Sequence, residues 1–117
     1  MRPNKQIVRE FLSRDPSTVA ALVADDMEWV EWGDGVPPSG VVHRGTAGIS
    51  ENIGDDTLRN EITRMTEEGD VVVAEGICHV TKTDGRSLKV RFCNIFELKN
   101  GRVRRQDSFG ALLQDPA

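Results

Sequence analysis

The strongest constraint on the fold of this chain is a pair of Asx-Gly dipeptides in its second half, Asp84-Gly85 and Asn100-Gly101. They separate three runs rich in β-branched and aromatic residues, at 71–82, 86–98 and 102–113. Asp or Asn followed by Gly suits the two positive-φ positions of a type I′ turn, so each dipeptide predicts a two-residue hairpin. We therefore expect three consecutive antiparallel strands, with a fourth at 59–67 that joins them through a turn around residues 68–69.

A two-residue turn fixes the register of the strands that it joins. Counting back from the two turns places Glu75 opposite Asn94, and Asn94 opposite Asp107, so the three side chains form a polar row on one face of the sheet. Period-two alternation adds these side chains to the same face: Val73, Ile77, His79, Phe92, Phe96 and Phe109. Because unpaired buried polar groups cost about 1–3 kcal/mol each, a polar row on an apolar face predicts a binding pocket. The alternative is that this face of the sheet is partly solvated.

The first half of the chain predicts three helices and one strand. Apolar residues at helical spacing follow Pro3, and a second helical pattern begins at Asp15-Pro16 and ends near residue 26. Residues 27–32 alternate as a strand, in which Trp29 and Glu31 share a face, and the Gly- and Pro-rich segment 33–40 is a loop. Residues 45–53 fit a short third helix. The expected fold is α+β, with a cone-shaped, curved antiparallel sheet packed against three N-terminal helices.

The composition narrows the function classes. A chain of 117 residues suits one domain, 1–117, and a net charge of −4 disfavours nucleic acid as a partner. No apolar run approaches the roughly 18 residues of a membrane span, so we expect a soluble, cytoplasmic protein. Cys78 and Cys93 are expected on the face opposite the polar row, as small apolar residues. No metal-ligand spacing or phosphate-binding loop is present, so no cofactor is implied.

Several runs of the sequence resemble the nuclear transport factor 2-like superfamily, in particular its ketosteroid isomerase-like and SnoaL-like polyketide cyclase branches. These runs are LVADD at 22–26, WVE at 29–31, VHRGTAGI at 42–49, NIFEL at 94–98, GRV at 101–103 and QDSF at 106–109. The resemblance covers nearly the whole chain. It implies a pocket for a small hydrophobic molecule and a homodimer, which we expect to form through an outer sheet face carrying Cys78, Val80 and Cys93.

The resemblance also implies roles for individual residues. The general base of the isomerases falls on Glu31, and their oxyanion-hole acid falls on Asn94, whose amide can still donate a hydrogen bond. The proton-transferring acid of the SnoaL-like cyclases falls on Asp107. Glu75, Ile77, His79 and the aromatic residues Trp29, Phe92, Phe96 and Phe109 would then line the pocket.

Two hypotheses remain open at this point. The first is a cofactor-independent proton-transfer enzyme, an isomerase or a cyclase, that acts on a carbonyl-type substrate through Glu31 or Asp107 with Asn94 as donor. The second is a non-catalytic ligand-binding or protein-interaction domain, which the absence of tyrosine, the other oxyanion donor of the isomerases, favours. An epoxide-hydrolase-like enzyme is a further alternative. If a candidate carboxylate lies in the apolar cone, desolvation should raise its pKa above about 4.

Overall fold

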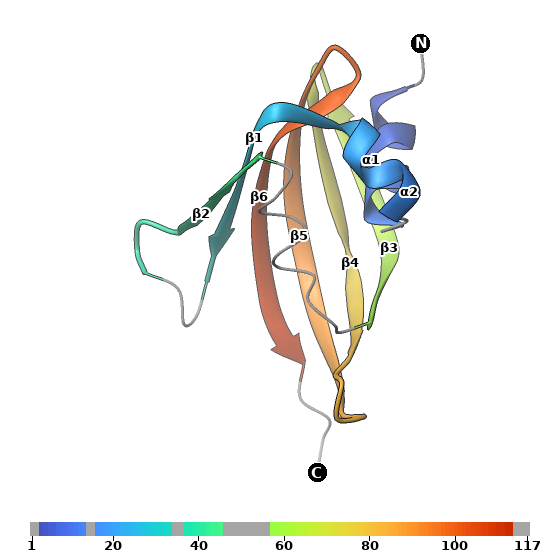
Figure 1. The fold of residues 1–117 in the computed structure, drawn as a ribbon, viewed down its shortest axis with the longest axis vertical. Helices are drawn as coiled ribbons and strands as arrows, with labels where there is room; N and C mark the ends of the chain where they lie inside the picture. The colour runs from blue at the N-terminus through green and yellow to red at the C-terminus, as the bar shows by residue number, and fades with distance from the viewer. Residues whose placement is uncertain (1–2, 14–15, 34–36, 46–56, 114–117) are drawn as a thin grey trace.

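The computed structural model describes residues 3–13, 16–33, 37–45 and 57–113, which form a strongly curved sheet with helices on its concave side (Figure 1). Helix α1, Asn4–Leu12, begins directly after Pro3 and directs four apolar side chains, one or two per turn, against the sheet. These side chains are Ile7, Val8, Phe11 and Leu12. Spacing of i, i+1, i+4 and i+5 places them on one face of the helix, as the sequence predicts.

The second helix is shorter than the sequence predicts. Helix α2, Pro16–Val19, passes into a 3-10 turn η1, Ala20–Leu22, and the chain is already extended at Val23. The prediction that this helix continues to residue 26 is therefore wrong, because Val23 and Met27 are buried as residues of a strand. The third predicted helix, 45–53, lies outside the described residues except for its first position.

Six strands form the sheet in the order β2-β1-β6-β5-β4-β3. Their bounds are β1 Val23–Trp32, β2 Val41–Arg44, β3 Thr57–Glu68, β4 Val71–Thr81, β5 Ser87–Lys99 and β6 Arg102–Leu113. Strands β3 to β6 form the predicted antiparallel meander. Strand β1 pairs in parallel with β6 and antiparallel with β2, a short strand that the sequence does not predict.

The β4–β5 turn shifts the predicted register by one residue. Asp84 does not take a positive φ, and only Gly85 does, with φ of 90°. The Gly85 amide donates to the carbonyl of Lys82, and the Lys82 amide donates to that of Arg86, so three residues form the loop. Such a three-residue loop is a type I turn followed by a left-handed glycine. As a result Asn94 pairs with Ala74, and Glu75 pairs with Cys93.

The β5–β6 turn has the predicted geometry, but a β-bulge follows it. Asn100 and Gly101 have φ of 54° and 75°, as a type I′ turn requires, and Lys99 pairs with Arg102. The register then shifts between Glu97 and Leu98, because β6 carries one extra residue there. Beyond the bulge Asn94 pairs with Ser108, and Asp107 pairs with Ile95.

The predicted polar row Glu75–Asn94–Asp107 is therefore wrong. A slip of one residue moves every side chain of a strand to the other face, and one slip occurs on each side of β5. Asn94 stays on the concave face with Phe92 and Phe96, whereas Glu75 and Asp107 lie on the convex face. The other predicted members on the same faces of β4 and β6 move with them: Val73, Ile77, His79 and Phe109. The two cysteines are also separated, because Cys78 lies on the concave face and Cys93 on the convex face.

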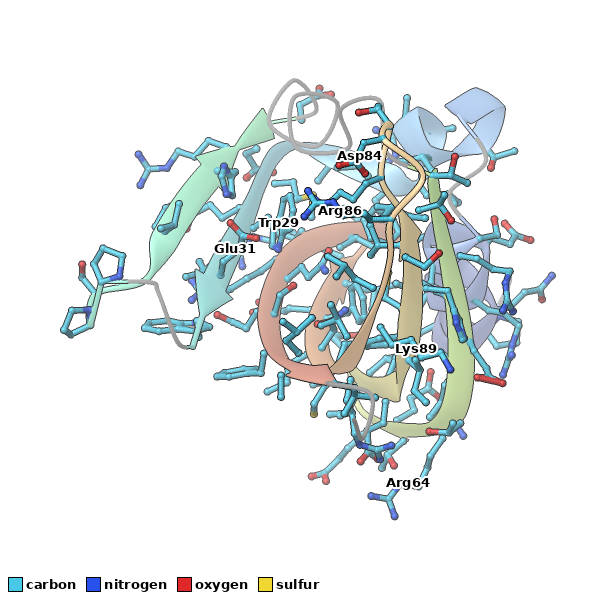
Figure 2. The ribbon with its side chains drawn as sticks, turned by 90° about the horizontal axis from the view of Figure 1, so that it is seen from below. Trp29, Glu31, Arg64, Asp84, Arg86 and Lys89 are labelled. Carbon is cyan, nitrogen blue, oxygen red and sulfur yellow. The ribbon has the colours of Figure 1, made fainter. Side chains whose placement is uncertain are left out.

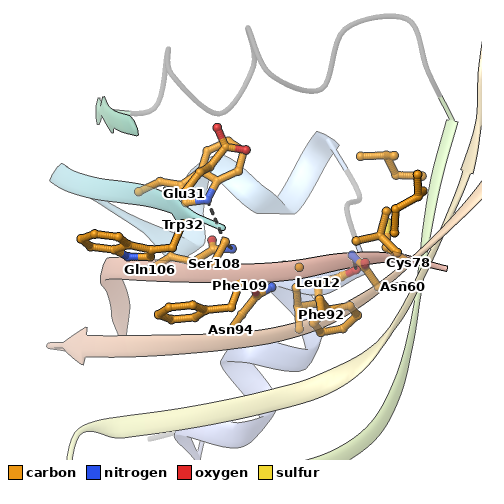
Figure 3. A pocket seen from close by; sticks show the side chains of 15 residues that line it. Leu12, Glu31, Trp32, Asn60, Cys78, Phe92, Asn94, Gln106, Ser108 and Phe109 are labelled. Atoms are coloured by element: carbon orange, nitrogen blue, oxygen red, sulfur yellow. Dashed lines mark hydrogen bonds between the residues drawn. The ribbon is translucent and has the colours of Figure 1, made fainter. Parts of the chain in front are cut away.

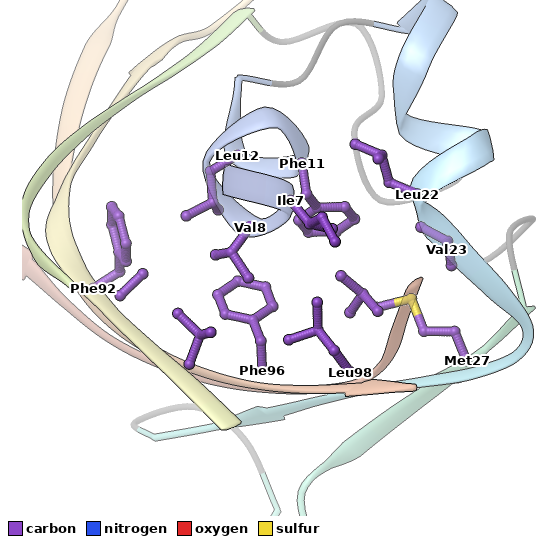
Figure 4. Close-up of a cluster of buried hydrophobic side chains, with 13 residues drawn as sticks. Ile7, Val8, Phe11, Leu12, Leu22, Val23, Met27, Phe92, Phe96 and Leu98 are labelled. Atoms are coloured by element: carbon purple, nitrogen blue, oxygen red, sulfur yellow. The ribbon is translucent and has the colours of Figure 1, made fainter. Parts of the chain in front are cut away.

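The hydrophobic core fills the cone between α1 and the sheet (Figure 4). Phe96 is completely buried, and its ring meets the ring of Phe11 edge-on at a centroid distance of 5.7 Å. Val8 and Met27 are also fully buried, so residues from α1, β1 and β5 share one core. Within the described part of the chain, no helix is both long and apolar enough to cross a membrane.

Candidate functional site

A different polar row lies on the concave face. Glu31 of β1 is the partner of Ser108 on β6, and Ser108 is the partner of Asn94 on β5, so the three residues lie side by side across adjacent strands. Neighbouring strands are about 4.8 Å apart, so each side chain is near the next. The sequence predicts two of these three residues, Glu31 and Asn94. It misses Ser108 because the predicted register between β5 and β6 is wrong by one residue.

This row opens into a cavity of about 320 Å³ between the sheet and the end of α1 (Figure 3). The polar side chains in its wall are Glu31, Asn60, Asn94, Gln106 and Ser108. The apolar part of the wall comes mainly from Leu12, Trp29, Leu58, Phe92, Val90 and Leu112. An apolar cavity with a few convergent polar groups is the usual form of a small-molecule site.

Glu31 is held by a histidine from the neighbouring strand β2. His43 of β2 has its Nε2 atom 2.9 Å from Oε2 of Glu31, and the exposed fraction of its side chain is only 19%. Its ring also packs on the indole of Trp29 at a centroid distance of 4.8 Å. The structure thus brings His43 to Glu31 through the β1–β2 pairing, which no local pattern in the sequence indicates.

Ser108 is fixed by two donors. The indole Nε1 of Trp29 donates to its Oγ atom at 2.8 Å, and Nε2 of Gln106 donates to the same oxygen at 2.8 Å. Gln106 is itself buried and is the cross-strand partner of Trp29. These two bonds join Trp29, Gln106 and Ser108 into one network on the cavity wall.

Asn94 is buried, with an exposed fraction of 8%, and its Oδ1 atom has no hydrogen-bond partner among the described residues. The amide is nevertheless part of the cavity wall, and because Oδ1 is fully buried, Nδ2 is the end that can reach the cavity. An unpaired buried polar atom costs about 1–3 kcal/mol. Such a cost is typical of a residue kept for function and not for stability.

We expect Asn94→Leu to raise the free energy of unfolding by about 1 kcal/mol, because it replaces an unpaired amide by an apolar side chain of similar size. Asn60→Leu is a matched control, since Asn60 also lines the cavity but donates from Nδ2 to the carbonyl of Leu12 at 2.9 Å. The free energy of unfolding of this control should fall by about 1 kcal/mol, because the substitution removes that hydrogen bond. Urea unfolding of both variants tests the expectation, and a loss of stability in Asn94→Leu would contradict it.

Asp107 lies on the convex face in an ion pair. Arg105 donates to both of its carboxylate oxygens at 3.0 Å, and Nε1 of Trp32 donates to Oδ1 at 3.0 Å. The hydrogen bonds from Arg105 lower the pKa of Asp107 more than burial raises it, and the bond from Trp32 lowers it further. The expectation of a raised pKa is therefore wrong for Asp107, because its surroundings stabilise the charged form.

We expect Asp107→Asn to lower the free energy of unfolding by about 1–2 kcal/mol at pH 7, because it removes charge-assisted hydrogen bonds. The folded-state pKa of Asp107 is lowered, so its contribution is present above the unfolded-state value near 4 and disappears as the pH falls through the folded-state pKa. The deficit should thus be equal at pH 7.5 and pH 5 and shrink below about pH 4. Urea unfolding at these pH values measures it. Unchanged stability at pH 7.5 would contradict a structural role for Asp107.

The other convex-face residues have partners of their own. Arg64 donates to both carboxylate oxygens of Glu75, which lowers the pKa of Glu75, and Arg64 projects outward from the sheet (Figure 2). The Nε2 atom of His79 lies 3.4 Å from Oε2 of Glu61. Neither Glu75 nor His79, nor the neighbouring Ile77, contributes to the cavity wall. Their predicted place in the pocket is wrong for the same reason as that of Asp107.

The four predicted aromatic pocket residues divide into two groups. Trp29 and Phe92 contribute to the cavity wall from the concave face. Phe109 occupies a convex-face position of β6 and stacks on Trp32 at a centroid distance of 6.3 Å, but it also borders the cavity. Phe96 is part of the core and does not reach the cavity. In the described part of the chain, no three His, Cys, Asp or Glu side chains lie close enough together to hold a metal ion.

Comparison with protein families matches residues 5–106 to the SnoaL-like domain. The chain belongs to the SnoaL-like domain family. This confirms the resemblance seen in the sequence, and the six-stranded cone with its helix on the concave side is the α+β fold of the nuclear transport factor 2-like superfamily. No curated protein sequence matches this SnoaL-like chain.

Solved structures share the fold of this SnoaL-like domain. A nuclear transport factor 2-like protein of unknown function from Burkholderia pseudomallei K96243 is 27% identical, with a TM-score of 0.76 over 93% of this chain and 91% of that one. TerC, crystallised with polyporic acid, is 26% identical, with a TM-score of 0.73 over 92% and 91% of the two chains. An LEH-like epoxide hydrolase from M. tuberculosis, 20% identical with a TM-score of 0.76 over 92% and 82%, is similar in fold alone.

Proposed function

We propose that this SnoaL-like domain is a cofactor-independent enzyme that moves a proton on a small, mainly apolar carbonyl compound. The observation that carries the proposal is the shared cavity of Glu31, a carboxylate held by His43, and Asn94, a buried amide with an unpaired atom. A base and a hydrogen-bond donor on one apolar cavity are the parts that enolisation of a ketone needs.

In the proposed reaction Glu31 accepts a proton from the carbon next to the carbonyl group. The electrons of the broken C–H bond form a C=C bond, and the electrons of the C=O bond move onto the oxygen, which becomes an enolate. Asn94 donates from Nδ2 to this oxygen, where negative charge develops. Glu31 then returns the proton to the same or another carbon, so the enzyme ends in its starting state without an oxidant or a metal.

The electrostatics of the site support Glu31, and not Asp107, as the base. His43 contacts one carboxylate oxygen of Glu31, whereas two nitrogens of Arg105 occupy both oxygens of Asp107. A carboxylate is a poor base when both of its oxygens accept hydrogen bonds and its pKa is lowered. Asp107 also faces away from the cavity. The assignment of proton transfer to Asp107, which the resemblance to cyclases implies, is not retained.

Proton exchange tests the proposal without knowledge of the natural substrate. In D₂O the protein should accelerate loss of the α-proton signals of 2-tetralone, a small aromatic ketone, with saturation kinetics measured by NMR. A panel of ketones of different size would then narrow the substrate class. Exchange no faster than the buffer rate for the whole panel would contradict the proposal.

The second candidate is a ligand-binding domain without chemistry, and the structure of TerC with polyporic acid favours it. Titration of this protein with polyporic acid, followed by tryptophan fluorescence, tests binding because Trp29 lies in the cavity wall. Binding that displaces 2-tetralone, without any accelerated exchange, would favour this second candidate. By the same resemblance the acid of an epoxide hydrolase would also fall on Asp107. Because Asp107 lies on the convex face, the epoxide-hydrolase alternative is not retained.

We also propose that the convex face of the sheet carries the homodimer interface. Cys78 and Val80 lie on the concave face and cannot contribute to it as expected, but Cys93 does lie on the convex face. Val71 and Phe109 on that face are exposed large hydrophobic residues, with exposed fractions of 37% and 41%. Sedimentation equilibrium of the wild type and of Phe109→Lys tests the interface, and a monomeric wild type at micromolar concentration would contradict it.

A further inference from the structure

We infer that the hydroxyl group of Ser108 is a second hydrogen-bond donor to the substrate oxygen, beside the amide of Asn94. Trp29 and Gln106 both donate to Ser108 Oγ, each at 2.8 Å. An indole N–H is only a donor, and a hydroxyl oxygen has two lone pairs, so both acceptor positions of Ser108 are occupied. The hydroxyl hydrogen remains, and no acceptor among the described residues takes it.

The position of Ser108 directs that hydrogen to the site. Ser108 lines the cavity and lies between Glu31 and Asn94 in the concave row, as the cross-strand partner of both. The unpaired Asn94 Oδ1 does not accept the hydrogen, because it has no partner in the described part of the chain. A donor beside the base, with both acceptor positions filled, favours a carbonyl or enolate oxygen as its partner.

The two donors to Ser108 act as positioning groups. They hold Oγ in one place and polarise its O–H bond, since a hydroxyl that accepts hydrogen bonds becomes a stronger donor. Ser108 and Asn94 then present an O–H and an N–H to one oxygen. This pair takes the place of the oxyanion hole in which, by the resemblance to isomerases, a tyrosine would be expected.

This inference rests on the proposed function for the identity of the ligand, a carbonyl compound that forms an enolate. Its test uses binding alone, with 4-nitrophenol as the enolate mimic, and Glu31→Gln as the background. That substitution gives the neutral side chain that resembles Glu31 after it has accepted a proton. The absorbance of bound 4-nitrophenol reports how much of it is ionised, and 4-nitroanisole, which cannot ionise, is the matched ligand.

Ser108→Thr and Ser108→Val are the matched variants, because both are β-branched strand residues of nearly the same shape and only threonine keeps the hydroxyl. We expect valine to bind 4-nitrophenolate roughly tenfold more weakly than threonine, as loss of a charge-assisted hydrogen bond predicts. Affinity for 4-nitroanisole should agree within about twofold, because it needs no donor for an anionic oxygen. Ser108→Ala repeats the comparison with serine if the larger side chains disturb β6.

Each outcome is decisive. The inference would be overturned if the threonine and valine variants bound 4-nitrophenolate equally well, or if valine weakened the binding of 4-nitrophenolate and 4-nitroanisole by the same factor. It would also be overturned if no 4-nitrophenolate bound in the Glu31→Gln background. A selective loss of phenolate binding together with no ketone exchange in the wild type would support the donor role of Ser108 and reject the proposed enzyme. Ketone exchange in the wild type without a selective loss of phenolate binding in the valine variant would support the proposed enzyme and reject the donor role of Ser108.

Discussion

Gly76→Ala should lower the free energy of unfolding by about 3 kcal/mol or more, which is a large part of the stability of a small domain. Gly76 is a buried residue of β4, opposite Ile62 of β3 and Phe92 of β5. A methyl group at this position would lie far inside van der Waals contact with the carbonyl oxygen of Glu61 and 2.9 Å from Cζ of Phe92. The Glu61 oxygen belongs to the backbone of a paired strand and cannot move without breaking the ladder.

Gly110→Ala is the matched control for this effect. Gly110 lies on the other side of Phe92, also in a strand and also without a positive φ, but its nearest obstruction is Cγ1 of Val90 at 3.0 Å. A side-chain methyl can shift, so this variant should lose about 1 kcal/mol or less. Urea unfolding of both variants measures the difference. If Gly76→Ala proved as stable as Gly110→Ala, the close approach of β3 to β4 would be incorrect.

Glu31→Gln should reduce proton exchange of 2-tetralone by about 100-fold to 10,000-fold, the usual contribution of a positioned general base. Glutamine keeps the size of the side chain and its place in the cavity wall, but it cannot accept the proton. The change measured is in kcat/KM for exchange, with folding checked by circular dichroism. Ligand affinity should change little, because the base acts on the reaction and not on binding.

Glu28→Gln is a closely matched control. Glu28 lies on the same strand, its side chain is exposed to 40% against 39% for Glu31, and its carboxylate also has cationic neighbours, Arg44 at 3.8 Å and Arg105 at 3.7 Å. It points to the convex face, so exchange should stay within about twofold of the wild type. Equal rates in the Glu31 and Glu28 variants would remove Glu31 from the mechanism.

His43→Gln should have an intermediate effect. If His43 positions the carboxylate of Glu31, its loss lets that side chain rotate, and we expect roughly tenfold slower exchange. A bystander would leave the exchange rate unchanged. A loss as large as that of Glu31→Gln would indicate instead that His43 takes a direct part in proton transfer.

Local patterns in the sequence determined helix α1 and the C-terminal strands of this fold. Alternation and β-branched residues between 71 and 113 predicted β4, β5 and β6 to within two residues, because hairpin strands are encoded by neighbouring residues. The family resemblance placed Glu31 and Asn94 correctly on the cavity, since it aligned whole segments and did not depend on cross-strand counting. The prediction of which side chains within one strand share a face was also correct, as with Phe92, Asn94 and Phe96 of β5.

Only the tertiary structure decided which residues of neighbouring strands lie side by side on the same face of the sheet. One extra loop residue before Arg86 and one bulged residue after Val103 moved Glu75 and Asp107 to the convex side and brought Ser108 into the site. Because the side-chain period of a strand is two, an error of one residue inverts a face, and dipeptide signals do not resolve such an error. The parallel pairing of β1 with β6 joins Glu31 to Ser108 across 77 positions of sequence, and the pairing with β2 adds His43. These contacts depend on how the whole sheet closes around its core, which no local pattern specifies.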